Sequence, residues 1–151
     1  MTFRRIEFGS DDFRKECDLR HRILRLPIGL NISDEDLSVE KYQCHFGLFD
    51  DGGGLFACII AVPLSCTRAK LRQMAVSEAF QNQGCGSQLI RKVETRLEEF
   101  GFVHISMNAR SSAVGFYEKL GYSKTDDEFL EVGIPHFRME KDLISKSCFA
   151  L

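Results

Sequence analysis

The first third of the chain carries one strand-like and one helix-like hydrophobic pattern. Apolar and polar positions alternate loosely over residues 3–8, which predicts a strand. Ser10 then offers an N-cap, and apolar positions recur at helical spacing from Phe13 to Leu24. We expect this helix to end near Leu26–Gly29, because proline and glycine both terminate helices.

The middle of the chain predicts two strands joined by a tight turn. Residues 44–49 read as a short strand, Asp50–Gly54 is a hairpin signal, and residues 55–64 are a nearly continuous apolar strand. A strand without polar alternation is covered on both faces, so we place it centrally in the sheet. The acidic segment before this pair, residues 31–41, is either a solvated loop or short helix, or an acidic rim beside a substrate.

A strand, a polar turn and a helix follow in order. A strand expected over residues 70–76 leads into a polar turn that ends at residues 81–87. Apolar positions then recur at helical spacing over residues 85–100, and Gly101 is a good C-cap. Residues 103–107 read as the next strand, so this strand–helix–strand unit should pair in parallel through a right-handed crossover.

The last third of the chain completes a mixed fold. The pattern predicts a turn at residues 108–110 and a short helix up to Gly121. An extended segment over 122–132 follows, with an interruption at 133–135. We expect a last strand at 137–143 and a short tail from about 144. With no repeat, linker or low-complexity tract, we expect a single domain over residues 1–151. Its fold class is α+β, with a mostly antiparallel sheet that contains one parallel unit.

Composition narrows the class of protein. A net charge of -2 argues against nucleic acid or an anionic membrane as the main partner. No apolar run approaches the roughly 20 residues of a membrane span, and the start lacks the apolar core of a signal peptide. The six cysteines form no CxxC pair or Cys/His cluster, so we expect reduced thiols, no metal site and a cytoplasmic protein.

The turn before the predicted helix at residues 85–100 is the strongest candidate for a ligand site. It contains Gly84 and Gly86, which lack a Cβ and let a ligand approach the backbone closely. The free N–H groups and the positive dipole end of a helix start favour a phosphate. A P-loop is excluded because no lysine follows Gly86, and a dinucleotide-binding turn is excluded because the GxGxxG spacing is absent. The remaining pattern, QxxGxG from Gln81 to Gly86, is weak by itself.

Downstream motifs strengthen this interpretation. Asn108 follows the next strand, and the segment Phe116–Tyr122 reads FYEKLGY. Together with the glycine turn, in this order, the chain resembles the GNAT superfamily of acyl-CoA-dependent N-acetyltransferases from about Phe3 to Lys141. Residues 129–136 and the early Leu26–Gly29 segment resemble a small bacterial group that includes ElaA and YjcF. The resemblance implies a three-layer fold with helices on both faces of the sheet.

The resemblance also implies acetyl-CoA as co-substrate. Backbone groups at the end of the strand before the turn would pair with the pantetheine arm, and one amide, that of Met74, would polarise the thioester oxygen. The amides of residues 83–87 would hold the pyrophosphate. The implied cofactor-binding residues are Met74, Ala75, Val76, Gln81, Asn82, Gln83, Gly84, Cys85, Gly86, Ser87, Asn108 and Phe116.

The resemblance assigns the general acid to one residue but leaves several candidates for the general base. Tyr117 matches the family's general acid, which protonates the departing thiolate. Some family members carry a glutamate eleven residues before the motif glutamine, but here that position is Lys70. We therefore favour Glu131 or His136 as the base. His45, the acidic residues 34–36 and proton removal through water stay open as alternatives.

The acceptor is expected to be a primary amine on a small molecule or a peptide. Asp34 and Glu35 are placed to attract a cationic amine by their charge, and a homodimer is possible. The alternative is a CoA-binding sensor or interaction module that kept the fold and lost the transfer reaction. Tyr117 and the complete glycine turn favour the enzyme, whereas Lys70 leaves room for the sensor.

Overall fold

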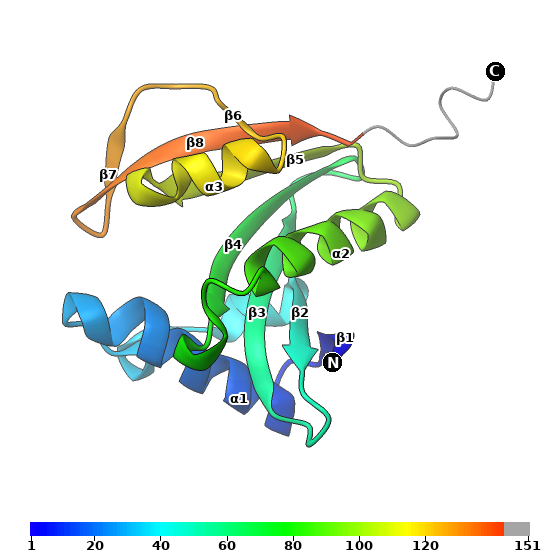
Figure 1. Ribbon diagram of the computed structural model, residues 1–151, viewed down its shortest axis with the longest axis vertical. Coiled ribbons are helices and arrows are strands. Elements are labelled where there is room, and N and C mark those ends of the chain that lie inside the picture. Colours follow the sequence, from blue (N-terminus) through cyan, green and yellow to red (C-terminus); the bar gives the residue numbers. More distant parts are fainter. Residues whose placement is uncertain (144–151) are drawn as a thin grey trace. The chain divides into compact units, whose positions relative to one another are not determined.

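The structure is a computed structural model, and it describes residues 1–143 (Figure 1). The tail predicted from about residue 144 lies outside this part of the chain. The sheet has the strand order β1-β2-β3-β4-β5-β8-β6, and β7 pairs with β8. Its strands are β1 (Thr2–Ile6), β2 (Cys44–Phe49), β3 (Leu55–Pro63), β4 (Arg68–Val76), β5 (His104–Arg110), β6 (Ser123–Lys124), β7 (Phe129–Glu131) and β8 (Ile134–Asp142). The α-helices are α1 (Asp11–Arg20), α2 (Cys85–Glu99) and α3 (Val114–Lys119).

The described chain divides into two compact units. The first contains residues 1–62 and 72–93, and the second contains residues 63–71 together with those from 94 onward. β4 and α2 each contribute residues to both units. Within the described residues, no helix has both the length and the apolar composition needed to cross a membrane.

In the first unit, the antiparallel meander has the predicted order. β1 pairs with β2, and β2 pairs with β3, in antiparallel register. All side chains of residues 56–61 in β3 are buried, which confirms the central position expected from its continuous apolar sequence. An added Cβ at Gly47 in β2 would lie 2.5 Å from Leu55 Cδ1, so a side chain here would require the Leu55 side chain to move. The meander therefore packs tightly around this glycine.

The N-terminal helix begins and ends where its sequence signals predict. The Ser10 hydroxyl accepts a hydrogen bond from the Phe13 amide, which caps α1. The helix then continues through a π-helical turn, η1 (His21–Arg25), and a 3-10 turn, η2 (Leu26–Ile28). Gly29, with φ of 76°, ends it in the left-handed conformation. The acidic segment that follows contains the 3-10 turns η3 (Ile32–Asp34) and η4 (Ser38–Tyr42).

In the second unit, β4 and β5 pair in parallel, with Arg68 opposite His104. This confirms the predicted strand–helix–strand crossover and, with the antiparallel pairs, the mixed fold class. β5 also pairs with β8 along its whole length, as far as Arg110 opposite His136. The turn expected at residues 108–110 is therefore wrong, because this ladder keeps the segment extended.

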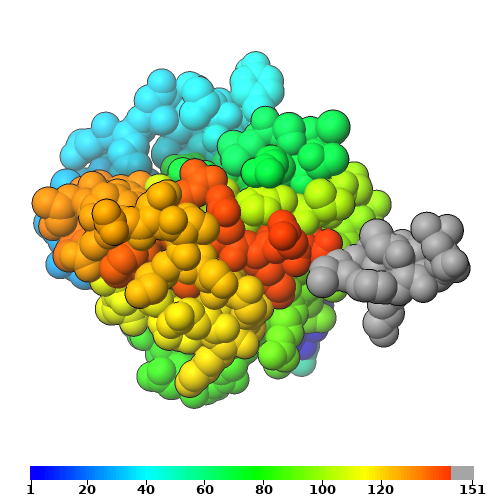
Figure 2. Space-filling model, turned by 90° about the horizontal axis from the view of Figure 1, so that it is seen from above, coloured from blue at the N-terminus to red at the C-terminus, as the bar shows by residue number. Residues whose placement is uncertain are grey.

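The C-terminal hairpin also differs from its prediction. The extended segment expected over residues 122–132 is divided into β6 and β7, which pair with different parts of β8. β8 already begins at Ile134, so the expected interruption shrinks to Val132 and Gly133, whose φ angles are 47° and 74°. At this turn Leu130 and Val132 are exposed, and residues of this part of the chain (orange) lie at the surface in Figure 2.

Candidate functional site

The C-terminal half of β4 contains a residue in the left-handed conformation. Gln73 has φ of 57°, which few residues other than glycine adopt. Such a residue within a strand turns the neighbouring peptide groups out of the regular ladder. Met74, Ala75 and Val76 follow directly; Ala75 is buried, and the other two are half-buried. The backbone predicted to pair with the pantetheine arm thus begins directly after a residue in the left-handed conformation.

The glycine turn has the geometry of an anion site. Asn82 and Gly84 have φ of 60° and 80°, and the Gly84 carbonyl accepts a hydrogen bond from the Gln88 amide at 3.0 Å. Since α2 starts at Cys85, the N–H groups of residues 85–87 have no intrahelical acceptor and lie at the positive end of the helix dipole. A Cβ added to Gly84 would meet no atom within 4 Å. This open backbone fits a pyrophosphate.

Two glutamines of the motif stabilise the turn itself. The side-chain amide of Gln81 donates to the Val76 carbonyl at 2.9 Å, which ties the turn to the end of β4. The side-chain amide of Gln83 donates to the Ala79 carbonyl at 2.8 Å. These predicted cofactor residues therefore shape the backbone, and their side-chain amides already have acceptors in the first unit.

The predicted acceptor residues, Asp34 and Glu35, have different environments. Asp34 is exposed at the end of η3. Glu35 accepts hydrogen bonds from Arg25 Nε at 2.5 Å and Arg25 Nη2 at 3.1 Å, and the Arg25 hydrogen bond is the main cause that lowers the pKa of Glu35. Arg25 Nη2 also donates to Gln73 Oε1 at 2.9 Å. Our sequence interpretation missed Arg25, although a basic residue at a helix end before an acidic segment was a usable signal.

In the second unit, Tyr117 is a buried residue of α3, 8% exposed. Its ring contacts Phe116 edge-on at a centroid distance of 5.0 Å and Tyr122 at 5.9 Å. Burial raises the pKa of Tyr117 to about 12. The hydroxyl therefore keeps its proton over the whole physiological range, as a donor to a departing thiolate requires.

The two favoured bases lie together in the second unit. Glu131 ends β7, and one of its carboxylate oxygens lies 3.5 Å from His136 Nε2. His136 Nδ1 lies 2.7 Å from the Ile134 carbonyl oxygen; because a carbonyl only accepts, Nδ1 carries a proton. In the neutral imidazole, Nε2 is then the acceptor. Asn108 donates its side-chain amide to the other Glu131 oxygen at 3.1 Å. The predicted cofactor contact Asn108 thus joins the candidate bases.

His45, the alternative base, belongs to a buried ionic cluster of the first unit. Its Nδ1 lies 2.9 Å from both carboxylate oxygens of Glu16, and its Nε2 lies 2.8 Å from the Glu40 carbonyl. Both neighbours only accept, so this geometry suits a doubly protonated ring. Burial opposes that charge, but Glu16 outweighs it and raises the pKa of His45. With both nitrogens occupied, His45 has a structural role in this conformation.

Arg20 pairs with both carboxylates of this buried ionic cluster. It donates to Glu16 at 2.9 Å and forms a bidentate pair with Glu40 at 2.8 Å for each bond, and Arg72 adds a bond to Glu40 at 3.1 Å. Glu16, Glu40 and His45 are close enough together to ligate one metal ion. Their carboxylate oxygens are already paired with Arg20, Arg72 and the His45 ring, so this donor set does not fit a cation.

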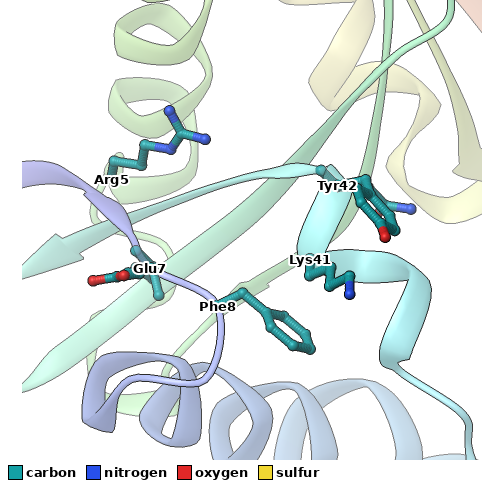
Figure 3. A pocket seen from close by; sticks show the side chains of 7 residues that line it. Arg5, Glu7, Phe8, Lys41 and Tyr42 are labelled. Carbon is teal, nitrogen blue, oxygen red and sulfur yellow. The ribbon is translucent and has the colours of Figure 1, made fainter.

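A separate cavity of about 610 Å³ opens beside the end of β1. Figure 3 shows the labelled lining residues Arg5, Glu7, Phe8, Lys41 and Tyr42. The cavity contains none of the predicted site residues. It is lined by Arg5, Ile6, Glu7, Phe8, Lys41, Tyr42 and Gln43.

Fold and glycine turn together define an acetyltransferase of the GNAT type. The sequence profile of the acetyltransferase (GNAT) domain matches residues 38–143. The chain therefore belongs to the GNAT family, a family of acetyl-CoA-dependent acyltransferases, as the sequence motifs predicted.

Relatives in Bacillus subtilis agree with this assignment. The uncharacterized N-acetyltransferase YitI is 32% identical over 133 residues, which cover 83% of this chain and 89% of that protein. The uncharacterized protein YyaT is 33% identical over 75 residues; this match spans 50% of the chain and about half, 51%, of YyaT.

Solved structures share the fold. A Lactobacillus plantarum protein assigned as an N-acetyltransferase superposes with a TM-score of 0.83 at 21% identity, covering 95% of this chain and all of that one. An aminoglycoside 6'-N-acetyltransferase complexed with coenzyme A superposes at 0.77, with 17% identity and coverage of 97% and 99%. Escherichia coli ElaA also superposes at 0.77, with 17% identity and coverage of 93% and 99%.

Proposed function

We propose that this protein is a cytoplasmic N-acetyltransferase that moves the acetyl group of acetyl-CoA to a primary amine by direct attack within a ternary complex. The observation that carries the proposal is the glycine turn at the start of α2. Its open Gly84 and the N–H groups of residues 85–87 suit the pyrophosphate of CoA. Membership of the GNAT family supports acetyl-CoA as the donor.

In the proposed reaction, the amine nitrogen attacks the thioester carbon while the backbone amide of Met74 polarises the carbonyl oxygen. The new C–N bond forms, the C–S bond breaks, and the thiolate takes the Tyr117 proton. Either Glu131 or His136 accepts the proton that the amine loses, directly or through water. The proximity of the two groups supports this role, because a proton taken by either one can be shared between His136 Nε2 and the Glu131 oxygen that lies 3.5 Å away. The reaction as proposed uses no metal, so it should be insensitive to chelators.

We propose a cationic amine as acceptor, on a small molecule or a peptide. Asp34 is exposed and carries its charge toward solvent, whereas the charge of Glu35 is balanced by Arg25. Asp34 is therefore the first residue to test. Asp34→Asn should raise the KM of a dicationic amine more than that of a monocationic one, and added salt should reduce the difference.

Thiol release tests the proposal directly. The wild-type protein is given acetyl-CoA and a panel of polyamines, aminoglycosides, amino acids and peptides, and free CoA is measured with a thiol reagent. Amine-dependent release is expected, with the same rate in EDTA. Light scattering of the same sample decides whether the active species is a monomer or a homodimer.

The alternative is a CoA-binding sensor that has lost transfer. Lys70, which stands where some family members carry a glutamate, leaves room for this alternative. Tight binding of acetyl-CoA by calorimetry, with no thiol release for any amine in the panel, would support the sensor and reject the enzyme.

A further inference from the structure

One arginine connects two segments of the first unit that are distant in sequence. Arg25, at the end of η1, donates hydrogen bonds to Glu35, the residue that follows η3, and to Gln73 in β4. Its side chain is only 13% exposed. Because one guanidinium carries several donors in a fixed plane, Arg25 sets the position of both partners relative to each other.

Gln73 is the partner that needs support. A left-handed conformation at a residue with a Cβ costs free energy, and it persists only where surrounding groups hold it. Arg25 Nη2 donates to the side-chain oxygen of Gln73 at 2.9 Å. The backbone carbonyl oxygen of Gln73 lies 4.0 Å from Cys58 Sγ. The contacts to Gln73 therefore come from the end of η1 and from β3.

The conformation of Gln73 has a direct consequence for its neighbour. The amide N–H of Met74 belongs to the peptide plane that follows Gln73, so the Gln73 backbone torsions aim that N–H group. In the proposed reaction this amide polarises the thioester. A change at Gln73 would misdirect the donor without touching the pyrophosphate turn.

We infer that Arg25 is a positioning residue for catalysis. It holds Gln73 in the left-handed conformation, which aims the Met74 amide, and through Glu35 it ties the acceptor-side loop to the same point. The role rests on the proposed function, because it matters for rate only if Met74 polarises a thioester. It also makes a structural claim that is independent of turnover: Arg25 stabilises the backbone at Gln73.

Kinetics of Arg25→Ala test the catalytic part. We expect kcat to fall by about tenfold to a hundredfold, because small misplacements of a reacting group cost this much. The KM and Kd of acetyl-CoA should stay within about threefold, about 0.7 kcal/mol. Arg22→Ala is the matched control, since Arg22 lies in the same turn and pairs with Glu78 instead; its kcat should equal that of the wild type.

A second substitution separates positioning from general loss of structure. Glycine adopts positive φ without help, so Gln73→Gly should restore part of the kcat of Arg25→Ala, and Gln73→Ala should not. Equal effects of glycine and alanine would overturn the inference. Should Arg25→Ala fail to fold, the same comparison is made in Arg25→Lys, whose ammonium cannot reproduce the guanidinium fork.

Hydrogen exchange decides the structural part without any turnover. Amides of residues 73–76 should exchange faster in Arg25→Ala than in Arg22→Ala, while those of residues 85–90 stay unchanged. A wild-type protein that releases no thiol would reject the proposed function but leave this measurement decisive. Unchanged exchange at 73–76, or an unchanged kcat in an active enzyme, would overturn the role of Arg25.

Discussion

His136 Nε2 lies 3.5 Å from a carboxylate oxygen of Glu131, while His136 Nδ1 donates to the Ile134 carbonyl. The hairpin register places Phe129 opposite His136 and Glu131 opposite Ile134, so these side chains share one face of the β7–β8 pair. The hydrogen bond to Ile134 fixes the tautomer and leaves Nε2 as the acceptor in the neutral ring.

This relationship predicts how the pH dependence of the reaction responds to mutation. In the wild type, kcat/KM should rise with pH as the base loses its proton. His136→Ala should reduce the rate and abolish this rise of kcat/KM on the acid side of the pH profile (the acid limb). Glu131→Gln, which keeps an oxygen acceptor for the Asn108 amide, should shift the acid limb to a different pH. His104→Ala is the control, because His104 pairs with Asp142 at 2.8 Å in the same sheet. An unchanged acid limb in both variants would point to proton removal by water.

A second prediction concerns Tyr117. Tyr117→Phe should lower kcat by about 10²–10⁴ with little change in acetyl-CoA affinity. Burial raises the pKa of Tyr117 to about 12, so its neutral donor form persists until the pH approaches that value, and this residue should contribute no basic limb below it.

Tyr122→Phe provides the matched comparison. The Tyr122 hydroxyl donates to Glu94 at 2.7 Å, so its loss should cost about 1.5–3 kcal/mol of unfolding free energy and leave kcat unchanged. Full turnover by Tyr117→Phe would remove Tyr117 from the mechanism.

A third prediction uses two glycines with the same backbone conformation. Gly84 and Gly9 both have φ of 80°, and an added Cβ would meet no atom within 4 Å at either. Alanine at each should cost about 1–2 kcal/mol of stability through strain. Only Gly84→Ala should also weaken acetyl-CoA binding, by about tenfold or more in calorimetry, because its methyl group occupies the space expected for the pyrophosphate. Equal affinities for the two variants would reject the proposed cofactor site.

A fourth prediction concerns the ionic cluster around Arg20. Burial disfavours charge on His45 and Glu40, but ion pairs outweigh it, which raises the pKa of His45 and lowers that of Glu40. The His45 contribution to stability is fully present below its unfolded pKa of about 6.5 and is lost as pH rises through its raised folded pKa. The Glu40 contribution is present above about 4.3 and is lost as pH falls through its lowered folded pKa.

Urea unfolding at a series of pH values measures these contributions. The wild-type free energy of unfolding should decline above neutrality, and His45→Gln should lose that decline while being less stable at pH 6. Parallel curves for the wild type and His45→Gln above pH 6 would show that His45 is not protonated in the folded state. His21→Gln is the control for a general effect of histidine removal, because His21 Nδ1 accepts from the Ile32 amide.

The sequence by itself determined the features that depend only on residues adjacent along the chain. Alternation and apolar runs located the strands, Ser10 and Gly29 marked the ends of the first helical segment, and Gly84 marked the start of α2. The proposed anion site belongs to this group as well. Its donors are consecutive backbone amides, so their geometry follows from local torsions and needs no distant partner.

Tertiary structure alone decided which charged side chains meet. Arg25 and Gln73 are separated by 48 positions, and Asn108 and Glu131 by 23. Hydrophobic patterning assigns charged residues to the surface, so it could not anticipate that Glu16 and Arg20 are fully buried or that Arg25 balances Glu35. Strand pairing likewise extended β5 to Arg110. Such partners are chosen by sheet register and by the requirement that buried charges be paired, and both are properties of the whole fold.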